Sequence, residues 1–301
     1  MVEILIITST EDIASINIRN NLLNSKSWEF SELDFTWHDN ALFKLDEIKL
    51  EKEKDFNPNV NKVYLGLTHD PLINLDNLRL EDTQINPDSL IFASRHRSKT
   101  SKPAFLVHTT GNWSREAKFG GEPRRLSHSS AFLIKSGFIS LVEQHELSNL
   151  KKFSIDMEVT HHGPTDLEKP LIFIELGSSK KEWVIQEAGR VVAQAIINTV
   201  LNYLKLQHDE TSKVGLGFGG THYAPQFRKL SLKEDMAISF ICPKYYIEDL
   251  DETMIAQMIS NTREEVDYFI VDWKGTNSQE KRHLIPLLEE FEIPIKKSKD
   301  F

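Results

Sequence analysis

The chain carries its most chemically versatile side chains in three short segments, each of which contains histidine. The first segment, residues 158–165, holds Glu158, His161 and His162 and ends in a Gly-Pro turn, directly after a predicted strand over residues 153–159. Histidine and glutamate bind zinc and transfer protons in enzymes. Adjacent imidazoles on such a turn point in different directions, so we expect one to face the site while the other supports it. A lone histidine would more often be a packing residue, but this combination indicates a functional site.

The second segment, residues 215–225, is rich in glycine. From Gly215 it contains the pattern G-x-G-x-x-G, which in dinucleotide-binding proteins follows a strong strand and opens a helix. Residues 209–213 are polar and Pro225 interrupts a helix, so we reject that interpretation. The segment instead predicts a flexible loop that presents His222, and its predicted substrate-binding residues are Gly219, Gly220, Thr221 and Tyr223. An irregular connection without a function is the alternative.

The third segment is basic, in a protein whose formal net charge is −9. Two predicted strands, residues 89–94 and 104–109, place His96 and His108 near their ends. Positive charges and an aromatic ring beside these histidines suit contact with the phosphates and bases of a nucleic acid, and the residues concerned are Arg95, Arg97, Lys99 and Trp113. Basic runs are more often solvated loops, and that alternative stays open.

Two weaker features lie near the C-terminus. A predicted strand over residues 266–272 ends in an acid, an aromatic ring and a base, namely Asp272, Trp273 and Lys274. These side chains belong either to the rim of a site or to the core. The basic tail, residues 296–299, is typical of a solvated chain end.

The elements that position these segments alternate between strands and helices. Runs of β-branched and aromatic residues predict strands over residues 2–8, 62–67, 89–94, 104–109, 153–159, 171–176, 237–242 and 266–272. Helical patterns cover residues 12–24, 129–146, 180–205, 252–261 and 278–291. This alternation predicts a three-layer α/β/α fold with a mixed, mostly parallel sheet. Glu175 lies at the end of an apolar strand, where α/β folds carry their sites.

Residues 40–61 interrupt this alternation. They are rich in Lys, Glu, Asp and Asn, and they predict a surface excursion with a short amphipathic helix as one option. We find no internal repeat, no low-complexity tract and no clear linker, so we expect a single domain over residues 1–301.

Composition limits the classes of protein to which the chain can belong. Its 40% hydrophobic and 27% charged residues are typical of a globular protein, and the net charge of −9 argues against a uniformly basic surface that coats nucleic acid. No window approaches the ~18 apolar residues of a membrane span, and no basic leader precedes the first strand, so we expect a cytoplasmic monomer that binds neither membrane nor DNA. The only cysteine, Cys242, is expected to be buried, which leaves no disulfide and no Cys-rich zinc site.

Together the segments resemble the D-aminoacyl-tRNA deacylases of the archaeal and plant type. The resemblance spans nearly the whole chain, and its motifs are Ser94-Arg95-His96-Arg97-Ser98, residues 103–113 with His108-Thr109-Thr110-Gly111-Asn112-Trp113, residues 158–165, Ile174-Glu175-Leu176-Gly177-Ser178-Ser179, Gly217-Phe218-Gly219-Gly220-Thr221-His222-Tyr223 and Asp272-Trp273-Lys274-Gly275. The resemblance implies hydrolysis of the ester between a D-amino acid and the 3′-terminal ribose of tRNA. It also implies zinc as the metal and a phosphorylase/hydrolase-like α/β/α fold.

The roles within such a site follow from the residue types. The predicted zinc ligands are His108, His161, Glu175 and His222, and the predicted catalytic residues are His96, Glu158 and His162. The three basic residues of the third segment are expected to hold the phosphates of the tRNA end. Trp113 or Tyr223 is expected to stack the terminal adenine, and Glu158 or Glu175 to accept the substrate's α-ammonium group.

Two rival functions use the same residues. A zinc-dependent aminopeptidase or amidohydrolase on a related fold would turn over peptides without any need for RNA. A non-catalytic RNA- or nucleoside-binding module would keep the histidines as structural residues and bind no metal.

Overall fold

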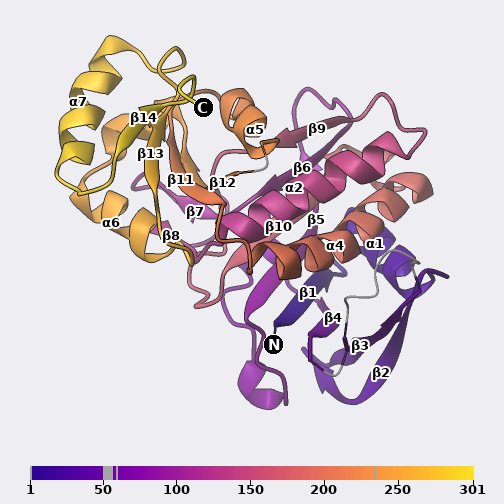
Figure 1. Ribbon diagram of the computed structural model, residues 1–301. Helices are drawn as coiled ribbons and strands as arrows, with labels where there is room; N and C mark the ends of the chain where they lie inside the picture. Colours follow the sequence, from indigo (N-terminus) through magenta and orange to yellow (C-terminus); the bar gives the residue numbers. More distant parts are fainter. Residues whose placement is uncertain (1, 50–56, 59, 234) are drawn as a thin grey trace.

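A mixed sheet of eight strands forms the centre of the computed structural model, which describes residues 2–49, 57–58, 60–233 and 235–301 (Figure 1). Its strand order is β2-β3-β4-β1-β5-β10-β6-β9. The bounds are β1 (Glu3–Ser9), β2 (Trp28–Trp37), β3 (Asn40–Ile48), β4 (Lys62–Thr68), β5 (Ser89–Arg97), β6 (Ala104–His108), β9 (Ser154–Met157) and β10 (Leu171–Ser178). The central strands β4, β1, β5 and β10 run parallel, as do β6 and β9, whereas β2, β3 and the β6–β10 pair are antiparallel neighbours. The predicted α/β fold with a mixed, mostly parallel sheet is confirmed.

The two faces of this sheet bury different partners. Alternate residues of β1 show the division, because Ile4 and Ile6 pack with the helices whereas Leu5 and Ile7 pack on the other side, against Trp37. The helical face is covered by α1 (Ile13–Leu23), α2 (Ala131–Glu146) and α4 (Gln186–Leu206), which lie side by side in Figure 1. The opposite face is covered largely by irregular chain and the short 3₁₀ turns Leu72–Asn74 and Leu80–Asp82.

A second sheet of four parallel strands lies beyond α2. Its order is β12-β11-β13-β14, with bounds β11 (Lys213–Phe218), β12 (Met236–Cys242), β13 (Tyr268–Val271) and β14 (Ile295–Lys297). Helix α2 contacts both β12 and β6, and α5 (Pro225–Ser231) contacts β12 and β9, so the two sheets share one hydrophobic cluster. The far face carries α6 (Glu252–Ser260) and α7 (Ser278–Glu289) (Figure 1). The remaining elements are β7 (Gly111–Asn112), β8 (Arg125–Leu126), α3 (Lys180–Trp183) and the 3₁₀ turn Lys244–Asp249.

The predicted surface excursion over residues 40–61 is wrong for its first half. Residues 40–48 form β3, which pairs with β2 through a two-residue turn at His38 and Asp39. Both turn residues have positive φ, 48° and 62°, as a tight hairpin with the twist of its strands requires. The strand buries Leu42 and Leu45, while its charged and polar residues are half-buried or exposed. The rest of the excursion, with its optional helix, falls mostly on residues 50–56 and 59, outside the described residues.

Two further predictions need correction. The glycine-rich segment is not wholly a loop, because residues 213–218 form β11 in the middle of the second sheet. The helix predicted over residues 180–205 is two helices, α3 and α4. The break is stabilised by Asn17, whose side-chain amide donates to the carbonyls of Trp183 and Ile185 at 2.9 Å each.

Two expectations about burial and membranes can be compared with the structure. Cys242 is fully buried in β12, as predicted. Within the residues that the structure describes, no helix is long and apolar enough to cross a membrane.

Candidate active site

The three histidine-containing segments of the sequence come together where the two sheets join. Glu158 directly follows β9, His108 ends the neighbouring β6, and Glu175 lies in β10 on the other side of β6. The backbone after Glu158 then crosses to the second sheet, because the Val159 N–H donates to the His222 carbonyl at 2.9 Å. One further residue on, the Thr160 N–H donates to a carbonyl of β12 at 3.0 Å. The local hydrogen bonds therefore bring His222 against residues that are far away in sequence.

Two buried carboxylates form the centre of the site. Glu158 and Glu175 are only 2% and 4% exposed, and His96 Nδ1 lies between them, 3.4 Å from Glu158 Oε2 and 3.3 Å from Glu175 Oε2. His222 Nε2 lies 2.8 Å from the other oxygen of Glu158. His108 Nε2 is 3.9 Å from Glu175 Oε1 and 4.0 Å from Glu158 Oε2. The cluster therefore balances two negative charges with imidazoles, which is how buried charge is tolerated.

The charges in this cluster depend on one another. Burial acts to raise the pKa of Glu158, but hydrogen bonds from His222 and His96 outweigh it and lower that pKa well below its usual range. In the same way, the neighbouring His108 and His96 imidazoles outweigh burial and lower the pKa of Glu175 to about 2. Burial acts to lower the pKa of His96, but the two carboxylates outweigh it and raise that pKa to about 11. The same carboxylates outweigh burial at His108 and raise its pKa as well. At neutral pH the centre thus contains two carboxylates and the imidazolium of His96.

A second set of imidazoles is held by backbone carbonyls. The Nδ1 atoms of His108, His161 and His162 lie 3.0, 2.8 and 2.6 Å from the carbonyl oxygens of Thr109, Val159 and Gly163. Because a carbonyl can only accept, each Nδ1 carries the proton and each Nε2 is directed to the cluster, the arrangement of metal-binding histidines. Burial and neighbouring histidines lower the pKa of His161 well below its usual range. They lower the pKa of His162 to about 4, so both rings are neutral at pH 7.

His162 also shows where the backbone is strained. Its φ is 48°, in the left-handed region that histidine seldom adopts, and its carbonyl accepts the Gly111 N–H at 2.8 Å. Strained residues that are held by their surroundings are concentrated at functional sites. Both His161 and His162 line the cavity, and their ring centroids are 4.5 Å apart. Both rings therefore face the site, whereas we expected only one of them to do so.

The orphaned polar atoms of the cluster fit a metal ion. Among the described residues, His96 Nε2 and His108 Nε2 are buried and have no hydrogen-bond partner. Three groups of side chains bring their ligand atoms within 4.8 Å of one another: His108, His161 and His162; Glu158, His161 and His222; and His96, Glu158 and Glu175. Imidazole nitrogen and carboxylate oxygen are donors that a divalent transition metal accepts.

These groups change the predicted ligand set. The four predicted ligands do not form one group, because Glu175 lies with His96 and Glu158, whereas His222 lies with Glu158 and His161. The residues predicted as catalytic, His96, Glu158 and His162, each belong to a possible ligand group as well. His161 is common to two groups and is thus the most central of the predicted ligands.

Two cavities meet at the histidines. One, of about 410 Å³, extends toward Asp12, Arg95 and Arg97, and the other, of about 260 Å³, extends toward Tyr245 and Tyr246. Both are lined by Phe119, His161, His162 and His222. A substrate bound at the cluster therefore has room on two sides, a basic side and an aromatic side.

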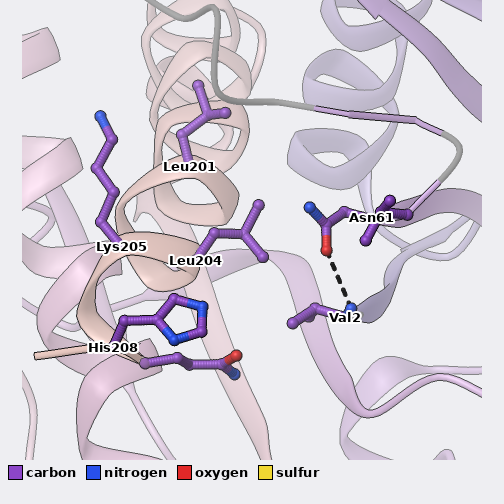
Figure 2. Close-up of a pocket in the computed structure, with 8 residues that line it drawn as sticks. Val2, Asn61, Leu201, Leu204, Lys205 and His208 are labelled. Atoms are coloured by element: carbon purple, nitrogen blue, oxygen red, sulfur yellow. Dashed lines mark hydrogen bonds between the residues drawn. The ribbon is translucent and has the colours of Figure 1, made fainter.

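Another cavity, of about 490 Å³, lies away from this site at the C-terminal end of α4 (Figure 2). Leu201, Leu204, Lys205 and His208 line it from one side, and Val2 and Asn61 line it from the other, where the Val2 N–H donates to Asn61 Oδ1 at 3.1 Å. Among the described residues, no carboxylate lines this cavity, and His208 is the only histidine that does. The described part of its lining therefore differs from the clustered acids and imidazoles of the candidate site.

The predicted basic contacts are not equivalent. The guanidinium of Arg95 donates to the Glu11 carbonyl at 2.8 Å and packs over the ring of Trp183. Arg97 lines the larger cavity, and the structure gives it no ion pair with a described carboxylate. Lys99 is exposed and does not line either cavity. Arg97 is therefore the best placed of the three for a phosphate.

Three of the predicted substrate-binding residues have structural roles instead. Trp113 is 1% exposed, and its indole N–H donates to the Thr160 carbonyl at 2.7 Å, so its buried ring supports the histidine loop and cannot stack a base. The N–H groups of Gly219 and Gly220 donate to the carbonyls of Cys242 and Gly275, so they are not free for a ligand. Their positive φ values, 97° and 78°, explain the glycines. Thr221 and Tyr223 are exposed, and the Tyr223 ring lies at the edge of His96.

Two residues of the site, Asp12 and Tyr245, were not predicted from the sequence. The buried carboxylate of Asp12 accepts the Arg95 N–H at 2.8 Å, although its sequence signalled only the start of a helix. The hydroxyl of Tyr245 lies 3.2 Å from His222 Nδ1, and the ring is half exposed beside the smaller cavity. Its position after β12, a strand of the second sheet, was the only available signal.

The chain is similar to proteins of one family along most of its length. A family model described as D-aminoacyl-tRNA deacylase matches residues 83–296. A protein named D-aminoacyl-tRNA deacylase from Pyrococcus furiosus is 34% identical over 277 residues, covering 92% of this chain and 93% of the relative. One of the same name from Thermococcus kodakarensis is 34% identical, covering 95% and 96%.

The fold is also similar to that of a solved structure. The crystal structure of a conserved protein of unknown function superposes with a TM-score of 0.81 at 30% sequence identity. The match covers 99% of this chain and 96% of that chain.

Proposed function

The chain belongs to the family of D-aminoacyl-tRNA deacylases, and we propose how its residues carry out that reaction. It is a hydrolase of ester bonds, which splits D-aminoacyl-tRNA into the free D-amino acid and tRNA. The observation that carries our assignment of the site is the buried pair Glu158 and Glu175 among five histidines, with polar atoms that lack partners. Charges of this kind are buried where a reaction or a metal needs them.

We propose that the metal is zinc. His161 would hold it together with either His108 and His162 or Glu158 and His222. When bound, zinc lowers the pKa of a coordinated water to about 7 and so supplies a nucleophile at neutral pH. Because Nδ1 of His108, His161 and His162 is bonded to a backbone carbonyl, Nε2 of each ring would remain available to bind the ion.

The remaining groups suit the charges that develop during ester hydrolysis. His96 is a buried cation whose Nε2 has no partner, so it can donate to the oxyanion of the tetrahedral intermediate. With His108, His161 and His162 as the ligands, Glu158 can take the proton of the attacking water. His222, between Glu158 and Tyr245, can then deliver a proton to the departing ribose oxygen. Glu175 is our candidate for binding the α-ammonium group of the substrate.

The two cavities suggest how the tRNA end lies. We place the phosphates beside Arg97 in the larger cavity. We place the terminal adenine against Tyr245 and Phe119 in the smaller cavity, with Tyr223 as an alternative stacking ring. We further propose that the protein acts in the cytoplasm as a monomer.

The comparison of two esters tests this function. The protein should hydrolyse D-tyrosyl-tRNA and leave L-tyrosyl-tRNA intact, and it should not turn over dipeptides. Equal hydrolysis of the two esters would contradict chiral selection. Turnover of a dipeptide in the absence of RNA would instead favour the rival aminopeptidase.

A further inference from the structure

We propose that a surface patch outside both cavities binds the acceptor end of the tRNA. The patch consists of Trp273, Lys274, Lys281 and Lys297, and we call it the Trp273 patch. It lies on the turn after β13, on α7 and on β14. The inference rests on the proposed function in one respect, since it takes tRNA as the substrate.

The patch combines an aromatic ring with cations from separate elements. Trp273 is 36% exposed, and the ammonium groups of Lys281 and Lys297 lie 4.6 and 4.5 Å from the centre of its ring. Neither lysine has an ion pair with a carboxylate of the described residues. The nearby carboxylates of Asp300 and Glu280 accept hydrogen bonds from backbone N–H groups instead, those of Lys297 at 2.9 Å and Asn277 at 2.7 Å. Exposed rings beside such cations bind the bases and phosphates of single-stranded RNA.

The turn that presents Trp273 is rigid. Asp272 is 6% exposed, its Oδ1 accepts the Gly275 N–H at 3.1 Å, and its backbone carbonyl accepts the Thr276 hydroxyl at 2.8 Å. A Cβ atom on Gly275 would lie 2.3 Å from Asp272 Oδ2, so the turn admits no larger residue there. A ring held in this way loses little conformational freedom when a ligand binds.

The same turn packs directly on the loop that carries His222. The Gly220 N–H donates to the Gly275 carbonyl at 3.3 Å, and His222 follows two residues after Gly220. Since successive Cα atoms are 3.8 Å apart, the Cα atoms of Trp273 and His222 are separated by about 20 Å at most. An RNA strand whose terminal ribose lies at the histidines therefore has its next nucleotides within reach of the patch.

The lysines of the Trp273 patch are positive charges in a protein whose net charge is negative. A chain with net charge −9 does not attract nucleic acid through its overall charge, so contacts with RNA depend on local basic areas. Charge complementarity therefore favours RNA as the partner. If the patch instead bound an acidic protein, the substitutions below would leave tRNA binding unchanged.

The first experiment measures binding of fluorescently labelled, uncharged tRNA to the full-length protein over a series of salt concentrations. Lys281→Ala combined with Lys297→Ala should weaken binding about tenfold and reduce the salt slope by about one to two. Trp273→Ala should weaken binding about 5- to 100-fold with little change in slope, and Trp273→Phe should restore most of it. The control is Lys151→Ala with Lys152→Ala, which removes the same charge from the loop before β9.

The second experiment compares a full substrate with a truncated one. For D-tyrosyl-tRNA the patch variants should raise KM about tenfold and leave kcat unchanged. For D-tyrosyl-adenosine, which lacks the rest of the RNA, they should behave like the unaltered protein. Patch variants that bind tRNA with the original affinity and slope would overturn the proposal. If the unaltered protein hydrolyses neither ester, the proposed function fails, and tRNA binding still decides the role of the patch.

Discussion

His222 Nε2 lies 2.8 Å from Glu158 Oε1, and this contact joins the loop after β11 in the second sheet to the loop after β9 in the first. The hydrogen bond from the Val159 N–H to the His222 carbonyl holds the same two loops together. The site therefore exists only when the two sheets are packed against each other. It follows that side chains on either sheet can alter the chemistry, and the predictions below use this dependence.

Replacing Glu158 by glutamine should abolish most of the activity while the fold is kept. The amide is nearly isosteric but can neither take a proton nor neutralise the buried His96 cation, so we expect kcat to fall about 10²- to 10⁴-fold. Asp156→Asn, two residues earlier, is the control, because Asp156 pairs with Arg228 at 2.9 Å outside both cavities. It should keep kcat within about twofold, as expected for a partly exposed ion pair. Similar losses in both variants would remove Glu158 from the reaction.

His161→Ala should remove most of the bound metal. His161 is shared by two of the three possible ligand groups, so its loss leaves neither of them complete. We expect metal affinity to fall at least about tenfold, measured by elemental analysis of the purified proteins. His208→Ala, in the cavity of Figure 2, is the control and should retain the full metal content. Full metal content in His161→Ala would show that the ion binds elsewhere.

Tyr245→Phe should slow the reaction without changing stability. The hydroxyl of Tyr245 lies 3.2 Å from His222 Nδ1 and so helps to fix the orientation and tautomer of that ring. We expect kcat to fall about tenfold with KM unchanged. Tyr246→Phe is a matched control from the same cavity wall. An equal effect of the two substitutions, or an effect on KM alone, would contradict a positioning role.

The stability of metal-free protein should depend on pH through Glu175. Burial alone would raise the pKa of this group, but the neighbouring His108 and His96 imidazoles lower it from 4.5 to about 2. Its stabilising contribution is therefore present above pH 4.5 and is lost as the pH falls to about 2. Over that range Tm should fall less steeply in Glu175→Gln than in the unaltered protein, with Glu289→Gln as a control for the lost charge. Parallel curves for the three proteins would contradict this assignment.

How much of the fold could be predicted depended on how each strand is buried. The apolar residues of β5 and β10 were recognised because both faces are covered. The hairpin of β2 and β3 was missed, since only Trp28 and Trp37 of β2 are buried and the polar residues between its aromatic and aliphatic ones suggested a surface segment. Strand β11 was missed because a Cβ on Gly215 would lie 2.4 Å from Ile270, so the sheet requires a glycine that weakens the strand signal.

The site was only partly predictable for a related reason. Histidines and acids at strand ends can be recognised as candidates from their residue types. All seven predicted ligands and catalytic residues lie in one cluster in the structure. Tyr245 and Asp12 gave no such signal, because their contacts arise only when distant segments pack together. Trp113 and the two glycines were assigned to the substrate since sequence does not reveal that their polar groups already have partners within the protein.

The most direct test of the central claim is the rate of D-tyrosyl-tRNA hydrolysis by one protein sample in three states: as purified, after chelation, and after zinc is added back. If the histidine cluster holds the metal, chelation should abolish hydrolysis. Added zinc should then restore it in the unaltered protein but not in His161→Ala. Undiminished hydrolysis of the D-ester by the chelated, metal-free protein would contradict the account.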